Sequence, residues 1–150
     1  MILVRSGAQK DRLRPLSWRI VATNRKGADA GFAARRLAAD RKRYELAIDL
    51  YLRDCYARRS VARVSELAEL LGVPRAYLSR VVAQLFGRPL SAILREKQLA
   101  EAKRLLTDVA PLTHSEIAAA SGFGHRSTFY RVFREAAGMT PGEYQRRFRK

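Results

Sequence analysis

Two stretches of the sequence carry arginine, hydroxyl and imidazole side chains at helical spacing. In residues 75–86 the candidates are Arg75, Ala76, Ser79 and Arg80, and in residues 125–137 they are His125, Arg126, Ser127, Tyr130 and Arg131. An arginine can donate two hydrogen bonds to O6 and N7 of guanine, hydroxyls can bond base edges, and a methyl group can contact thymine. A helix that packs on one side and shows such groups on the other is suited to reading the major groove of DNA. We therefore interpret the two stretches as candidate surfaces for reading DNA.

Four further arginines are candidates for contacts to phosphate groups: Arg88, Arg134, Arg146 and Arg147. Such contacts hold a protein on the duplex without selecting a base sequence. For Arg80 and Arg131 the alternative is an ion pair within the protein. For His125 the alternative is a neutral residue of the turn before the helix.

Other chemistries find little support in the composition. The chain has two histidines, one cysteine and no paired carboxylates at a plausible site, so no nucleophile–base pair or metal cluster assembles. We expect no enzymatic activity, no metal and no cofactor. The cysteine, Cys55, lies late on an expected helix, where a small core residue is the simplest interpretation.

The net charge indicates a polyanionic partner. Thirty Lys and Arg against fourteen Asp and Glu give the 150-residue chain a net charge of +16 and a pI of about 11.1. No run of apolar residues is long enough to span a bilayer, so no membrane partner is expected. The apolar opening, Met1–Val4, is shorter than the core of a signal peptide. We expect a cytoplasmic protein associated with the nucleoid.

The periodicity of apolar residues predicts helices through most of the chain. One helix is expected from near Ala38 to about Arg58, with Leu46 or Ala47, Leu50 and Tyr51 on its apolar stripe. The others are a first helix-turn-helix unit at about 64–86, a connecting helix at about 90–106, a second helix-turn-helix unit at about 114–137, and a helix after Thr140 and Pro141.

The two helix-turn-helix units are copies of one pattern. Leu67 and Ala68 precede Gly72 by the same spacing at which Ile117 and Ala118 precede Gly122. In both copies the glycine provides the backbone freedom for the turn. The second copy also begins with a capping box of Thr113 and Glu116, whereas the first has Arg63 at the cap position and is expected to be capped less well.

Residues 1–40 form a basic and less organised segment. Residues 1–43 hold twelve basic and three acidic residues, a net +9, and the other 107 residues hold eighteen and eleven, a net +7. Only Leu16–Val21, around Trp18, suggests a short buried or strand-like piece. The segment is either a basic arm that follows DNA phosphates, a linker, or the joint to a domain outside the sequence.

The order and spacing of many residues across 44–148 resemble the DNA-binding domain of AraC/XylS-family transcriptional regulators. The matching residues include Tyr77-Leu78-Ser79-Arg80, Gly87, Leu99, Ala102, Leu105-Leu106, Gly122-Phe123, Ser127, Phe129, Arg131, Phe133, Gly138, Thr140-Pro141 and Tyr144. The resemblance implies an all-α domain, residues 41–150, of about seven helices with two helix-turn-helix units joined by the connecting helix. Phe123, Phe129 and Phe133 are expected in the core.

The chain departs from this family pattern at a few positions. Val82 and Ala83 replace a usual Phe and Lys, and Gln98 and Gln145 each stand where Arg is usual. The first unit is therefore expected to make fewer cationic contacts than the second. The forty amino-terminal residues are too few for the ligand-sensing domain of most relatives, so no small-molecule domain is evident.

The resemblance implies a transcriptional regulator that binds double-stranded DNA and reads two successive major grooves. Its positions imply that the base-reading residues are Arg75, Ala76, Ser79, Arg80, His125, Arg126, Ser127, Tyr130 and Arg131. The alternative is a fragment or partner-dependent module that binds RNA polymerase or another regulator and contacts DNA only weakly. Two units on adjacent grooves would read half-sites about 10–10.5 base pairs apart.

Overall fold

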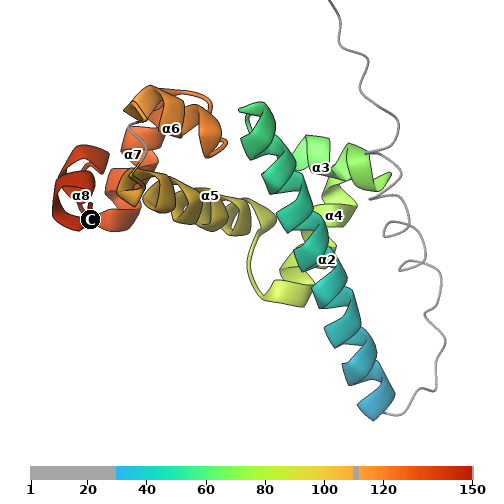
Figure 1. Cartoon of the computed structure of the whole chain (residues 1–150). Coiled ribbons are helices and arrows are strands. Elements are labelled where there is room, and N and C mark those ends of the chain that lie inside the picture. The colour runs from blue at the N-terminus through green and yellow to red at the C-terminus, as the bar shows by residue number, and fades with distance from the viewer. Residues whose placement is uncertain (1–29, 110–111, 150) are drawn as a thin grey trace, which may run out of the picture. The chain divides into compact units, whose positions relative to one another are not determined.

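The computed structural model describes residues 30–109 and 112–149, and all regular structure in these ranges is helical (Figure 1). The seven helices are α2 (Ala30–Arg58), α3 (Val64–Leu71), α4 (Arg75–Phe86), α5 (Leu90–Thr107), α6 (His114–Ala120), α7 (Arg126–Ala137) and α8 (Pro141–Phe148). The all-α fold with two helix-turn-helix pairs is confirmed. The expected piece at Leu16–Val21 lies outside the described residues.

The described residues divide into two compact units, each with one helix-turn-helix pair. The first unit combines α2 up to Leu50 with residues 63–90, which hold α3 and α4. The second combines residues 51–62 with the chain from Ser91 onward, which holds α6, α7 and α8. The division of the chain after residue 40 stays a prediction.

Helix α2 begins at Ala30, eight residues before the expected start near Ala38. Five of the ten residues 30–39 are alanine, which has the highest helix propensity of all residues. Propensity therefore extends the helix into a stretch where no apolar periodicity signals it.

The buried stripe of α2 differs from the expected one. The residues that it buries are Tyr44, Ala47, Ile48, Tyr51, Leu52 and Cys55. Of the residues expected on this stripe, Tyr51 is buried, and of the alternatives Leu46 and Ala47 it is Ala47 that is buried. Leu46 is 54% exposed, and the prediction is wrong for Leu50, which is 38% exposed. Both sets of residues fit a helical period, and packing against the neighbouring helices selects the one with two tyrosines and a cysteine. The core position of Cys55 is confirmed.

In the first unit, α3 and α4 pack through small and branched apolar side chains. Leu67, Ala68, Leu71, Leu78 and Val82 are all buried. Between the helices, Gly72 ends α3 in the left-handed region at φ 68°, and the N–H of Val73 donates to the carbonyl oxygen of Ala68 at 3.1 Å. Pro74 is the residue directly before α4.

The core of the second unit is built around the aromatic residues of α7. Phe129 lies with its ring centroid 5.5 Å from those of both Phe123 and Phe133. All three rings are buried, as expected. The other members of this core are Ala102, Leu105, Leu106, Ile117, Ala118 and Val132. Burial of each large side chain stabilises the unit by about 1.5–3 kcal/mol.

Capping boxes fix the starts of α6 and α8. The hydroxyl of Thr113 accepts from the N–H of Glu116, whose carboxylate accepts from the N–H of Thr113, and Thr140 and Glu143 repeat this pattern. These hydrogen bonds, first those from the backbone N–H, lower the pKa of both carboxyl groups. Helix α3 begins after Arg63 without a side-chain cap, as expected.

Candidate nucleic-acid interface

Helix α7 separates an apolar face from a cationic and hydroxyl face. Phe129, Val132 and Phe133 are buried, whereas Arg126, Ser127 and Arg131 are exposed and Tyr130 is half-buried. Arg126 is the first residue of the helix, and the exposed residue before it, His125, makes no side-chain cap. The structure thus brings the candidates of the second unit onto one surface that a duplex could reach.

Helix α4 presents its candidates at the same helix positions. Arg75, Ala76 and Arg80 are exposed and Ser79 is half-buried. They are the first, second, fifth and sixth residues of α4, and Arg126, Ser127, Tyr130 and Arg131 occupy these positions in α7. Both helices have 12 residues and end at a glycine with φ 70°. The duplication inferred from the sequence therefore extends to the exposed faces.

The turn of the second unit is held from outside the helix-turn-helix pair. The backbone of Gly122 has a φ of 78°, which favours glycine. Its carbonyl oxygen accepts from the Nε2 of Gln98 at 2.9 Å and from the N–H of Ala62 at 3.3 Å. Gln98, an unusual residue at its position by the family pattern, is buried and supports the turn.

A polar cluster connects α6, α7 and α8. Nδ1 of His114 is hydrogen-bonded to the hydroxyl of Tyr130, and Nε2 of His114 lies 3.2 Å from Oε1 of Gln145. Arg126 donates to the Tyr130 hydroxyl at 3.3 Å, with its guanidinium 4.9 Å from the centre of the Tyr130 ring. The sequence interpretation did not include His114 in the site, because only the fold brings residues 114, 130 and 145 together.

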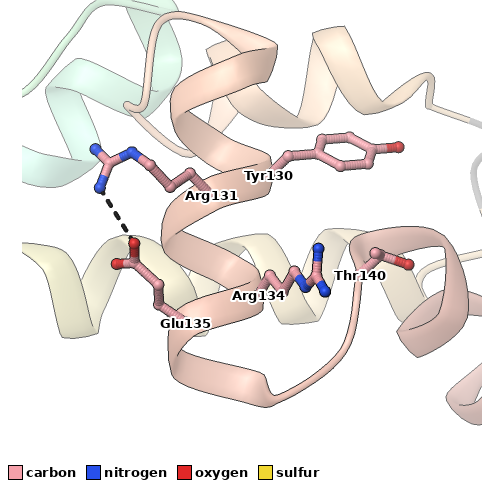
Figure 2. A pocket seen from close by; sticks show the side chains of 5 residues that line it. All are labelled: Tyr130, Arg131, Arg134, Glu135 and Thr140. Carbon is pink, nitrogen blue, oxygen red and sulfur yellow. Dashed lines mark hydrogen bonds and ion pairs between the residues drawn. The ribbon is translucent and has the colours of Figure 1, made fainter.

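A hollow in the surface of the second unit is lined by Tyr130, Arg131, Arg134, Glu135 and Thr140 (Figure 2). On one side of α7, Arg131 extends toward Glu135, and its Nη1 lies 3.4 Å from the Glu135 carboxylate. On the other side Arg134 extends toward Thr140 (Figure 2). The pair of Arg131 and Glu135 is more than half exposed, so it contributes about 0–1 kcal/mol and a DNA phosphate or base could replace it.

All four candidates for phosphate contacts are exposed. Arg88 follows the glycine that ends α4, Arg134 lies in the last turn of α7, and Arg146 and Arg147 lie in the last turn of α8. In the ranges that the structure describes, no three His, Cys, Asp or Glu residues are grouped as a metal ion would require. No helix there is long and apolar enough to cross a membrane.

The chain is similar to known regulators over its helical part. A family model described as a helix-turn-helix domain matches residues 67–147. The HTH-type transcriptional regulator GlxA of Rhizobium meliloti is 36% identical over 81 residues, which are 54% of this chain and 25% of that protein. The chain thus spans about a quarter of this relative.

Solved structures share the fold. The C-terminal domain of the two-component response regulator YesN from Fusobacterium nucleatum is 28% identical, with a TM-score of 0.60 over 68% of this chain and 97% of that one. The DNA-binding domain of AdpA, solved in complex with a target DNA, is 21% identical, with a TM-score of 0.60 over 69% of this chain and 90% of that one.

Proposed function

The chain belongs to the AraC/XylS-type family of helix-turn-helix DNA-binding domains, which are parts of transcriptional regulators and not enzymes, and from this premise we propose that it reads DNA sequence with two recognition helices, α4 and α7. The two helices would enter successive major grooves. Because their exposed residues differ, the preferred site would be asymmetric and would not need to be a palindrome.

The repeated exposure of the same four helix positions carries this proposal. In each helix the first, second and sixth residues are exposed and the fifth is half-buried, while the opposite face is buried. All four residues at the first and sixth positions are arginines: Arg75, Arg80, Arg126 and Arg131. An arginine near the start of a recognition helix can reach a guanine edge, with a discrimination of about 1–3 kcal/mol per bidentate pair.

The base-reading roles that we assign are carried over from the positions of the AraC/XylS-type family, and the phosphate roles follow from the charge and exposure of the arginines. The base-reading set is Arg75, Ala76, Ser79, Arg80, His125, Arg126, Ser127, Tyr130 and Arg131, and the phosphate set is Arg88, Arg134, Arg146 and Arg147. The domain would comprise residues 41–150 and would be preceded by a basic segment, whose residues 30–40 belong to α2. The cytoplasmic, nucleoid-associated location belongs to the same proposal, because a regulator must reach its promoter.

Selection of bound duplexes from a random pool tests the proposal. The selection is run at about 150 mM salt, where loose electrostatic binding is weakened. We expect two short motifs whose centres lie about 10–10.5 base pairs apart. A single motif would mean that one recognition helix contacts only the backbone. The absence of any motif, with binding that disappears as salt rises, would refute sequence reading.

Binding to RNA polymerase or another regulator is the second candidate function. Leu46 and Leu50 lie one turn apart on α2 and are exposed, next to the exposed Glu45. A small apolar surface with an acidic neighbour suits a protein contact more than a DNA contact. If Leu46 and Leu50 serve this contact, exchanging both for alanine lowers transcription from the target promoter while leaving its binding to DNA unchanged.

A further inference from the structure

We propose that His114, which lies outside both recognition helices, is a positioning residue that aims Arg126 at the DNA through Tyr130. Base discrimination by the second unit would then depend on a side chain of α6. This inference rests on the proposed function, because it requires that Arg126 reads a base.

The hydrogen bonds of the cluster form a chain with one direction. Oε1 of Gln145 can only accept, so the tautomer that fits this contact carries its proton on Nε2 of His114. Nδ1 then accepts from the hydroxyl of Tyr130. A lone pair of the hydroxyl oxygen remains for the N–H donated by Arg126. Every polar atom along this path has a partner that complements it.

The chain restricts a side chain that would otherwise be mobile. Arginine has many rotamers, and fixing it on a base costs conformational entropy. Here the guanidinium lies 4.9 Å from the centre of the Tyr130 ring and donates a hydrogen bond to its hydroxyl. Arg126 is also the first residue of α7, the helix end that contacts base edges in helix-turn-helix proteins. Ordering at this place reduces the cost of binding.

His114 is itself held on several sides. It is the first residue of α6, directly after the capping box of Thr113 and Glu116. A Cβ atom placed on Gly142 of α8 would lie 3.5 Å from Cε1 of the imidazole, so the ring packs against the backbone there. The Tyr130 ring lies with its centroid 5.5 Å from the His114 ring. The imidazole is therefore a fixed point from which the Tyr130 hydroxyl can be oriented.

The first unit has no counterpart of this chain. Val64 is the first residue of α3, as His114 is of α6, and Ser79 occupies in α4 the position of Tyr130 in α7. A valine side chain can neither donate nor accept a hydrogen bond. The motif read by the first unit therefore provides an internal control in every binding experiment.

The test compares base preference among His114→Leu, His114→Asn, Tyr130→Phe and Arg126→Ala in the full chain. Leucine keeps much of the volume without polar atoms, whereas the amide oxygen of asparagine is as many bonds from Cβ as Nδ1 and can accept from Tyr130. Competition between duplexes that differ at the base pair read by Arg126 gives the discrimination. Binding to a scrambled duplex and the Tm provide the readouts for general affinity and folding.

We expect His114→Leu and Tyr130→Phe to lower discrimination at this base pair by about fivefold or more, which is the lower end of what one bidentate contact provides. His114→Asn should retain most of it. Preference in the first motif, binding to the scrambled duplex and Tm should stay close to those of the unchanged protein.

The other outcomes show which assignment is wrong, the base-reading role of Arg126 or the positioning role of His114. If Arg126→Ala leaves base preference unchanged, the proposed role of Arg126 is wrong, and this inference is wrong with it. If Arg126→Ala changes the preference but His114→Leu and Tyr130→Phe do not, His114 only packs and the inference alone is overturned. Higher discrimination in Tyr130→Phe would also overturn it, since the hydroxyl would then hold Arg126 away from DNA. Should His114→Leu not fold, His114→Phe, which keeps a planar ring without hydrogen-bonding atoms, takes its place, because Tyr130 itself belongs to the base-reading set.

Discussion

Replacing Arg134 by glutamine should change the salt dependence of DNA binding and leave base preference alone. Arg134 is exposed in the last turn of α7 and extends toward Thr140 at the start of α8 (Figure 2). Glutamine removes the charge and keeps most of the side-chain stem. The matched control is Arg126→Gln, which removes one charge from the same helix at a residue assigned to base reading.

The magnitude follows from the number of phosphate contacts. Each neutralised phosphate contributes about −0.9 to the slope of log K against log salt, so four contacts give about −3.6 and three about −2.7. Between 50 and 200 mM salt the affinity should fall about 150-fold with four contacts and about 40-fold with three. Arg126→Gln should keep the slope and instead lower discrimination between sites by about 1–3 kcal/mol.

Fluorescence anisotropy with a labelled duplex, titrated at several salt concentrations, measures both quantities. The selected site and a scrambled duplex are compared for the unchanged protein and for both variants. Equal slopes for the unchanged protein and Arg134→Gln would refute the assignment of Arg134 to a phosphate. A slope for Arg126→Gln that is reduced as much as expected for Arg134→Gln would refute the division into reading and positioning arginines.

Two further predictions concern stability. Gly124→Ala should lower the Tm more than Gly138→Ala does. Both glycines have a positive φ, 79° and 70°, but only at Gly124 would the new Cβ atom lie 2.4 Å from Cγ2 of Val61. Thermal unfolding followed by circular dichroism compares the two variants, and equal losses of Tm would contradict the close contact. The capping carboxylates of Glu116 and Glu143 have a lowered pKa in the folded state, so their stabilisation is complete above the unfolded value of 4.5 and is lost as the pH falls through the folded value. The double variant Glu116→Gln and Glu143→Gln, whose amide oxygens can still accept from the caps, should therefore lose less Tm between pH 7 and pH 3, and an unchanged acid dependence would show that other groups control it.

Local signals in the sequence predicted the helices of the two helix-turn-helix units well. Thr113 with Glu116 marked the start of α6, and the turn glycines Gly72 and Gly122 have positive φ as expected. Such features depend on a few neighbouring residues, and the same pattern occurs twice. The buried face of α7 followed from one stripe of large apolar residues, including Phe129.

The sequence was less informative where packing chooses between equivalent patterns. Leu46 and Leu50 have the same spacing as Ile48 and Leu52, and only the neighbouring helices determine which pair is buried. Within the site, the sequence indicated the exposed arginines but not the residues that orient them. Gln98 acts on a turn 24 residues away, a separation at which sequence patterns carry no information about contacts.

The unequal support of the two recognition helices bears on how such a protein can change its target. In the first unit, Val64 occupies the helix position that His114 has in the second. A substitution at Arg75 or Ser79 therefore disrupts no hydrogen-bonded chain of the kind that links His114, Tyr130 and Arg126. In the second unit a change at Tyr130 also removes partners from Arg126 and His114. If both helices read DNA as we propose, new binding preferences would arise by single substitutions more readily in the first unit than in the second.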